Sequence, residues 1–228
     1  MNIGIKDVLQ RIRPFFIIYL LLLCCCLIIK LIFSKEEIYF AVNTRYSDWA
    51  DFIAPYITDI GNGWTTVALS AILVLFNYRK AFLLASTYAF TSLSAQLIKH
   101  IAKSPRPKLY FRDQLSQIHF VKGMYIDLHD SFPSGHTVTA FSTALLITYF
   151  FKNKRWGILF LLIAVMVGYS RMYLSEHFFE DVTAGSALGV FLTIFWISWL
   201  DNKRFLRTPK WNKGLLWGTK SKVLSPES

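Results

Sequence analysis

Long apolar runs constrain this chain more than any other feature of its sequence. The first run, residues 15–33, is uninterrupted until Lys30. At about 1.5 Å per residue, a helix of this length crosses a hydrocarbon core of roughly 30 Å. A water-soluble chain could not bury this run together with the five that follow, so the sequence predicts an all-α membrane protein, a bundle of six transmembrane helices. The further runs are 64–76, 81–97, 137–151, 156–168 and 182–200.

The first run is preceded by basic residues, as a secretory signal is. It is nevertheless long for the core of a signal peptide, and no small-x-small cleavage site follows it in residues 30–35. We therefore interpret residues 15–33 as an uncleaved first transmembrane helix.

The basic residues predict the orientation of the six spans. An even number of spans places both termini on one side of the membrane, together with the turns at 77–80 and 152–155. This side holds 15 of the 25 Lys and Arg residues but only 3 of the 14 Asp and Glu residues. Because cytoplasmic segments are rich in Lys and Arg, we expect both termini in the cytoplasm. The short chain and short loops favour a bacterial inner membrane, and the net charge of +11 reflects topology rather than nucleic-acid binding.

We interpret the chain as one membrane domain with short ends. Residues 1–14 form the cytoplasmic N-terminus, 15–200 the six-span domain, and 201–228 a basic cytoplasmic tail that we expect to be poorly ordered from Thr208 onward. The segment between the first two spans is expected to form a short helix along the outer interface, kinked at Pro55, that covers or props the bundle. Its apolar residues recur at helical spacing: Trp49, Phe52, Ile53, Tyr56 and Ile57.

Three charged segments interrupt the apolar pattern where spans meet the outer side of the membrane. Residues 99–107 leave the third span, 130–136 enter the fourth, and 170–181 join the fifth to the sixth. The span count places all three segments on one face and at one depth. Ionisable groups at such a depth are costly, so their coincidence favours a functional site.

Each segment has an ordinary structural explanation when it is considered by itself. Lys99 fits a snorkelling lysine at a helix end, and Ser134 fits a helix N-cap. His177 and Asp181, four residues apart, fit a pair on a helix surface. None of these explanations accounts for the three segments meeting on one face. The remaining histidines are interpreted as ordinary loop residues: His100, His119 and His129.

Together, the charged residues suit phosphoryl transfer. The transition state spreads negative charge over three oxygens, so catalysis depends on positioning and on charge neutralisation. Arg106 and Arg171 can each offer a bidentate fork, and Lys99 adds a compact positive charge. Ser134 and Gly135 stand where the fourth span begins, and the free N–H groups of that helix end can face a bound phosphate.

Two histidines can divide the remaining chemistry. One must attack phosphorus, and the other must protonate the departing oxygen. Asp181 follows His177 by one helical turn, where a carboxylate can fix the imidazole tautomer and stabilise the positive charge that develops. These residues lack the carboxylate cluster or His/Cys spacing of a metal site, so we expect no metal and no cofactor.

The three segments resemble the signature of the type 2 phosphatidic acid phosphatase superfamily. That signature reads Lys-x6-Arg-Pro, Pro-Ser-Gly-His and Ser-Arg-x5-His-x3-Asp. Every fixed position is matched in the right order, and the six-span hydropathy is similar to that of the integral-membrane branch. The matching residues are Lys99, Arg106, Pro107, Pro133, Ser134, Gly135, His136, Ser170, Arg171, His177 and Asp181.

The resemblance implies a role for each catalytic residue. His177 would be the nucleophile that forms a phosphohistidine, Asp181 its partner, and His136 the acid for the leaving group. No metal would take part. The phosphate-binding residues would be Lys99, Arg106, Ser134, Gly135 and Arg171.

The resemblance also implies a lipid phosphate as substrate. Members of the membrane branch act on phosphatidic acid, phosphatidylglycerol phosphate, polyprenyl diphosphates such as undecaprenyl diphosphate, lipid A or sphingoid phosphates, and the sequence does not select among them. A lipid phosphotransferase that passes the phosphohistidine to another acceptor fits the same motifs. A transporter with a basic vestibule is disfavoured, because no span carries a charge at mid-depth.

Overall fold

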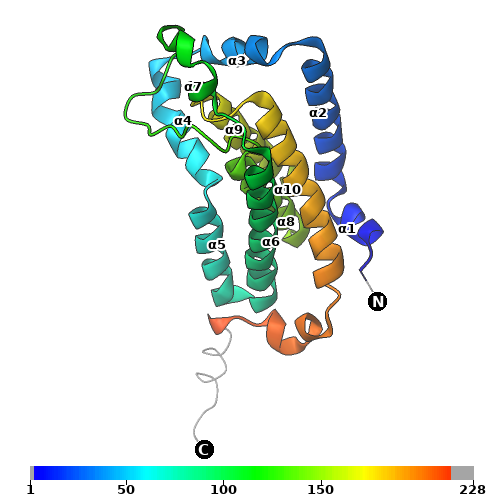
Figure 1. Cartoon of the computed structure of the whole chain (residues 1–228). Coiled ribbons are helices and arrows are strands. Elements are labelled where there is room, and N and C mark those ends of the chain that lie inside the picture. The colour runs from blue at the N-terminus through cyan, green and yellow to red at the C-terminus, as the bar shows by residue number, and fades with distance from the viewer. Residues whose placement is uncertain (1–2, 217–228) are drawn as a thin grey trace, which may run out of the picture.

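A computed structural model describes residues 3–216, and its regular elements are all helical (Figure 1). Every apolar run of the sequence lies in a long helix. These helices are α2 (Arg13–Ile32), α5 (Gly63–Phe76), α6 (Tyr78–Ala102), α8 (Gly135–Phe150), α9 (Trp156–Tyr173) and α10 (Phe179–Leu200). The shorter elements are α1 (Ile5–Arg11), α3 (Lys35–Asn43), α4 (Asp48–Ile60), α7 (Pro107–Tyr110), η1 (Arg112–Gln117), η2 (Arg204–Arg207) and η3 (Pro209–Asn212).

The long helices make this a multi-pass membrane protein. Within the described residues, α2, α6, α9 and α10 are each long and apolar enough to cross a bilayer. Helices α4 and α5 pass the same test as a pair that is bent by 51°, which gives a fifth span if the pair crosses once. Helix α8 has 16 residues and is short for an independent span. The structure therefore supports four or five spans by length and composition alone.

The region between the first two apolar runs differs from the single short helix expected there. It holds two helices, α3 and α4, and α4 continues through Pro55. The bend comes instead at the junction with α5, where Asn62 caps α5 by accepting a hydrogen bond of 3.1 Å from the backbone N–H of Trp64. A Cβ atom at Gly61 would lie 2.8 Å from the carbonyl oxygen of His136. Glycine therefore permits the close approach of this bend to the start of α8.

Helix α8 lies at the centre of the bundle and packs against α6, α9 and α10. Of its 16 residues, 11 are buried. Glycines bring α10 against it: a Cβ atom at Gly185 would lie 2.8 Å from the carbonyl oxygen of Ser134, and one at Gly189 would lie 2.6 Å from that of Val138. Gly185 and Gly189, spaced four residues apart, thus form a small-xxx-small pair that serves helix packing. The contact also fixes the start of α10 against the start of α8.

Helix α2 lies at the edge of the bundle, beside α10 (Figure 1). Only Phe15 and Tyr19 are buried among its residues, whereas Leu21 is 63% exposed and Leu31 is 86% exposed. Such a continuous apolar surface requires a hydrocarbon solvent. Among the four helices that are each long enough to span a bilayer, α2 is therefore the least covered by protein.

The described part of the C-terminal segment is more ordered than the sequence suggests. The Trp211 ring packs edge-on against Phe82 of α6 at 5.3 Å between centroids, and Tyr78 donates a backbone hydrogen bond to Lys213. Aromatic packing thus ties residues 208–216 to the bundle. The rest of the expected tail, residues 217–228, lies outside the described residues.

Candidate active site

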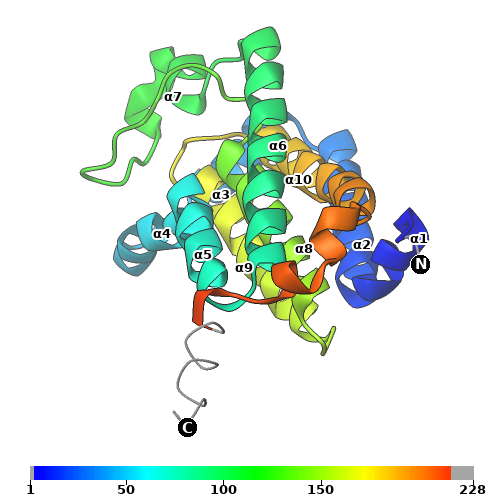
Figure 2. The same ribbon diagram turned by 90° about the horizontal axis from the view of Figure 1, so that it is seen from below.

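The three charged segments meet at one end of the bundle. The C-terminal end of α6, the start of α8 and the junction of α9 with α10 all lie at the upper end in Figure 1, under the loop that contains α7. Figure 2 shows this loop extending to one side of the bundle. Direct contacts join the segments: Arg106 contacts Glu176, and the backbone N–H of Ser134 donates to the carbonyl oxygen of Asp181 at 3.0 Å.

His177 and Asp181 form a buried pair at this end. Nδ1 of His177 lies 3.5 Å from Oδ2 of Asp181, and the two residues are 1% and 2% exposed. Asp181 Oδ2 also accepts a hydrogen bond of 2.8 Å from the backbone N–H of Phe178. His177 precedes α10 and Asp181 lies in its first turn, so this is not a pair on a helix surface. With Nδ1 facing the carboxylate, the other ring nitrogen, Nε2, is the one available for chemistry.

Ser131 completes this pair, and sequence reasoning did not assign it a role. Its hydroxyl group donates a hydrogen bond of 2.5 Å to Asp181 Oδ2 and lies 3.4 Å from His177 Nδ1. Ser131 is fully buried. It lies within the 130–136 segment, but no residue pattern marks a serine three positions before the Ser-Gly pair as a partner of a distant carboxylate.

The charge state of His177 follows from its surroundings. Burial lowers the pKa of His177 well below its usual value, and Arg171, Arg106, Lys99 and His136 lower it further. The imidazole is therefore neutral around pH 7, which is the form that carries a free lone pair on nitrogen.

Two arginines from different segments converge on one carboxylate. Arg106 and Arg171 are 8% and 5% exposed, and the side chain of each contacts Oε2 of Glu176, at 3.4 Å in the case of Arg171 Nη2. Arg171 Nη1 also donates to Thr58 Oγ1 of α4 at 2.9 Å. Among the described residues, Arg171 Nε is a buried donor without a hydrogen-bond partner. Two adjacent guanidinium groups, one of which has an unpartnered N–H donor, are suited to bind phosphate oxygens. Through Thr58, helix α4 holds one of the two guanidinium groups.

Lys99 does not snorkel to water. Its side chain is buried in the last turn of α6 and donates a hydrogen bond to the carbonyl oxygen of Asp130. Asp130 has a φ of 56°, in the left-handed region, which turns the chain just before Ser131. Lys99 therefore fixes this turn and adds a third cation beside the two arginines.

Ser134, Gly135 and His136 open helix α8. The Ser134 side chain makes no N-cap bond to the helix backbone and instead accepts a hydrogen bond of 2.9 Å from Thr137 Oγ1. A Cβ atom at Gly135 would meet nothing within 4 Å, so this backbone faces open space. The first N–H groups of α8 thus receive no side-chain cap from Ser134, and an uncapped helix N-terminus is suited to an anion. His136 is half-buried in the same turn.

Two of the remaining histidines make specific contacts. The backbone carbonyl of His129 accepts a hydrogen bond of 2.9 Å from Arg106 Nε. His119 is not an ordinary loop residue. Its ring stacks on Tyr46 at 3.9 Å between centroids, and Nε2 lies 2.8 Å from Asp51. Its backbone carbonyl accepts a hydrogen bond of 2.8 Å from Asn43. His119 thus ties the loop after η1 to α3 and α4.

A comparison with protein-family models decides the family. The model of the PAP2 superfamily matches residues 80–205, which is more than half of the chain. The chain belongs to the PAP2 superfamily. The match includes every residue of the three segments, so the resemblance inferred from the motifs is confirmed.

Named relatives of this PAP2 protein include phosphatases of several lipids. It is 28% identical over 170 residues to phosphatidylglycerophosphatase B of Bacillus subtilis, covering 65% of this chain and 77% of that protein. It is 27% identical over 184 residues to the undecaprenyl-diphosphatase of Sulfolobus acidocaldarius, covering 76% and 82%. A shorter match, 43% identical over 72 residues, is to the bacitracin transport permease protein BcrC of Bacillus licheniformis. It covers 31% of this chain and only 34% of that relative.

Solved structures share the fold of this PAP2 protein. Aquifex aeolicus LpxE superposes with a TM-score of 0.64 at 23% identity, covering 74% of this chain and 98% of that one. A transmembrane PAP2-type phosphatidylglycerolphosphate phosphatase from Bacillus subtilis superposes with a TM-score of 0.61 at 27% identity, covering 86% and 98%. The all-helical membrane fold is therefore one that the family already contains.

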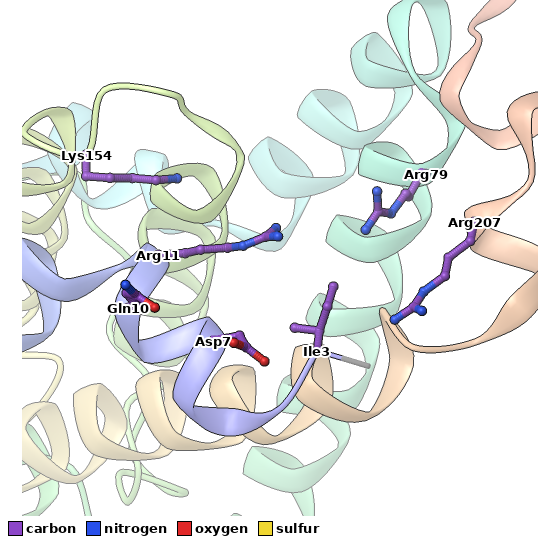
Figure 3. A pocket seen from close by; sticks show the side chains of 7 residues that line it. All are labelled: Ile3, Asp7, Gln10, Arg11, Arg79, Lys154 and Arg207. Carbon is purple, nitrogen blue, oxygen red and sulfur yellow. The ribbon is translucent and has the colours of Figure 1, made fainter. Parts of the chain in front are cut away.

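A separate cavity of ≈ 660 Å³ lies at the opposite end of the bundle. Figure 3 shows basic side chains from α1, α6, the 151–155 turn and η2 directed into it. None of the predicted site residues lines this cavity, so it is not the site described above. The lining residues are Ile3, Asp7, Gln10, Arg11, Arg79, Lys154 and Arg207.

Proposed function

We propose that this chain is a metal-independent lipid phosphatase that works through a phosphohistidine on His177. The observation that carries the proposal is the buried, neutral His177, whose Nδ1 faces Ser131 and Asp181 beside two buried arginines. An oriented nucleophile next to paired anion-binding forks is the arrangement that phosphoryl transfer requires.

In the first half-reaction, the cations hold the phosphate while His177 attacks. The lone pair of Nε2 forms a bond to phosphorus as the bond from phosphorus to the lipid oxygen breaks. In this scheme the bound phosphate anion stabilises a protonated His136. His136 gives its proton to that oxygen, so the lipid leaves as an alcohol, or as a monophosphate if the substrate is a diphosphate. Asp181 stabilises the positive charge that develops on the imidazole. Arg106 and Arg171 stabilise the charge on the phosphoryl oxygens.

In the second half-reaction, water releases the phosphate. His136, now neutral, accepts a proton from the attacking water, and the P–N bond breaks as the new P–O bond forms. Inorganic phosphate leaves, and both histidines return to their starting states. Lys99, Ser134 and Gly135 complete the phosphate-binding set in this scheme, through one cation and the free N–H groups of the first turn of α8.

An apolar groove next to the site supports a lipid substrate. It has a volume of ≈ 350 Å³ and lies between α6 and α10, where Ile98, Phe132, Leu188 and Phe191 line it. Phe132 directly follows Ser131, so the groove is continuous with the catalytic end of the bundle. We assign it to a hydrocarbon chain of the substrate, which would lie in the groove while its phosphate reaches the arginines.

The charge distribution supports one orientation in the membrane. The end that carries the basic cavity and the termini would face the cytoplasm, and the catalytic end would face the exterior or periplasm. In this topology α8 and the α4–α5 pair also cross, which gives six spans within residues 15–200. Residues 1–14 and 201–228 would then be cytoplasmic, in a bacterial inner membrane.

The names of the relatives limit the candidate substrates to a few lipid phosphates, but they do not single out one of them. Phosphatidylglycerol phosphate, undecaprenyl diphosphate and lipid A correspond to proteins similar to this chain, and phosphatidic acid shares the same phosphomonoester chemistry. A phosphotransferase would share the first half-reaction. One relative is named as a transport permease, so transport is the rival outside enzymes.

Phosphate release from purified protein tests the proposal. In detergent with EDTA, the protein should release inorganic phosphate from at least one lipid of a panel that contains the four candidates. Release of inorganic phosphate from the lipid substrate alone would support hydrolysis, whereas turnover that requires an acceptor, with label transferred to that acceptor, would show a phosphotransferase. Absence of release from every lipid, with transport activity in vesicles, would contradict an enzyme. Activity restored only by a divalent metal would contradict the metal-free scheme.

A further inference from the structure

A buried glutamate occupies the space between the two arginines of the site. Oε2 of Glu176 contacts Arg106 Nη1 and lies 3.4 Å from Arg171 Nη2, and Glu176 is 5% exposed. The mechanism above gives this carboxylate no step. A carboxylate this deeply buried persists only because it is paired with cations.

The arginine donors that Glu176 occupies are the ones a phosphate would need. Arg106 Nε already donates to the carbonyl oxygen of His129 at 2.9 Å, and Arg106 Nη2 faces Asp127 at 3.3 Å. Arg171 Nη1 is held by Thr58. Arg106 Nη1 and Arg171 Nη2, one nitrogen of each guanidinium, contact Glu176, and within the described residues Arg171 Nε has no hydrogen-bond partner. A phosphate oxygen and the Glu176 carboxylate oxygen cannot occupy the same position.

We propose that Glu176 is an internal competitor of phosphate, which holds the arginine forks in the resting enzyme and displaces the product. This proposal rests on the assignment of Arg106 and Arg171 as phosphate ligands. Substrate phosphate takes both forks and the Glu176 side chain moves aside. After hydrolysis the carboxylate returns to the arginines, so inorganic phosphate is released more readily. Glu176 is thus a specificity-determining residue that weakens binding of a free phosphate lacking a lipid chain.

The backbone around Glu176 is fixed, so only its side chain needs to move. The backbone N–H groups of Glu176 and His177 both donate to the carbonyl oxygen of Arg171, at 3.1 and 3.2 Å. The neighbouring Ser175 hydroxyl is held by Tyr39 at 2.9 Å and by Asn43 at 3.1 Å. Rotation of the Glu176 side chain therefore leaves His177 in place.

Direct binding of inorganic phosphate tests the competitor role. Isothermal titration calorimetry would be performed on the wild-type protein, on Glu176→Gln and on Glu180→Gln. Glu180 is a matched control, because it is a neighbouring carboxylate that pairs with Lys30 and Lys35 rather than with the arginines. Removing the Glu176 charge should tighten phosphate binding about tenfold or more, the effect of one charge-assisted contact. Glu180→Gln should bind phosphate as the wild type does.

Product inhibition gives a second expectation. The inhibition constant of phosphate should fall in Glu176→Gln by the same factor as its dissociation constant. Unchanged or weaker phosphate binding in a folded Glu176→Gln protein would overturn the proposal and leave Glu176 as a structural ion pair. Because binding is measured without turnover, this failure is distinguishable from a failure of the proposed function, which would show as absent phosphate release by the wild type.

A measurement on the wild type covers the case in which Glu176→Gln does not fold. Infrared difference spectra of protein labelled with ¹³C-glutamate would be recorded with and without vanadate. Displacement from the arginines should shift one glutamate carboxylate band on vanadate binding. A spectrum in which no glutamate band shifts at saturating vanadate would contradict the displacement.

Discussion

The hydroxyl group of Ser131 donates a hydrogen bond of 2.5 Å to Oδ2 of Asp181, the carboxylate oxygen that faces the His177 ring. A residue of the loop that leads into α8 thus holds a carboxylate in the first turn of α10. Because the hydroxyl also lies 3.4 Å from His177 Nδ1, it restricts where the imidazole can rest. Ser131 is therefore a positioning residue, one that acts through Asp181 and His177.

Removing this hydroxyl should lower turnover without removing the site. We expect Ser131→Ala to reduce kcat roughly tenfold, because one hydrogen bond to a charged group is lost, and to leave KM nearly unchanged. Steady-state kinetics on a soluble short-chain lipid phosphate would measure both constants. Ser142→Ala is the matched control, since Ser142 is a buried serine whose hydroxyl donates to the carbonyl oxygen of Thr139 in its own helix. Equal losses in the two variants would mean a general packing effect.

The low pKa of His177 predicts a neutral ring through the physiological range. Its folded pKa is lowered by burial and by the neighbouring cations, so protonation begins only when the pH falls well below 6.5. The nucleophilic form should persist at all higher pH values. A ¹⁵N NMR titration of histidine-labelled protein, with His177→Asn to assign the signal, would follow this directly. A midpoint at or above 6.5 would contradict the account of the site.

His136 and His177 should respond differently to the leaving group. Loss of a general acid typically costs about 10²–10⁴-fold, and this cost shrinks when the leaving group is a stable anion. We therefore expect His136→Ala to regain activity on an aryl phosphate, whereas His177→Ala should be inactive on every substrate. Rates on alkyl and aryl phosphates would be compared for both variants. Losses that do not depend on the leaving group would refute His136 as the acid, and the reverse pattern would exchange the two roles.

The sequence predicted the helices, because long apolar runs indicate membrane-spanning helices. It also predicted the convergence of the charged segments, because counting the spans assigns each connecting segment to one side of the membrane. It did not predict Ser131 or Glu176 as parts of the site. Both act through partners that are 50 and 70 residues away in the chain, and no local pattern reports such a pairing. Helix α3 was also missed, although Ser34 and Glu37 form a capping box that marks its start. The bend between α4 and α5 depends on close packing against α8, which hydropathy does not report.

The proposed topology predicts opposite accessibility for two exposed lysine positions. Lys122 lies in the loop at the catalytic end, and Lys152 lies in the turn between α8 and α9. After Cys24, Cys25 and Cys26 are replaced by serine, Lys122→Cys should react with an impermeant maleimide in intact cells. Lys152→Cys should react only after the membrane is opened. Labelling of both positions from the same side would overturn the six-span arrangement.

The phosphoenzyme tests the central claim most directly. An aryl phosphate makes the first half-reaction fast, so the covalent intermediate should accumulate and survive a rapid alkaline quench. Peptide mapping by mass spectrometry should then find a single phosphate on His177, stable to alkali and labile to acid. The variant Asp181→Asn should lower the rate at which it forms. Phosphate on another side chain, or turnover without any phosphoenzyme at the earliest quench times, would contradict His177 as the nucleophile.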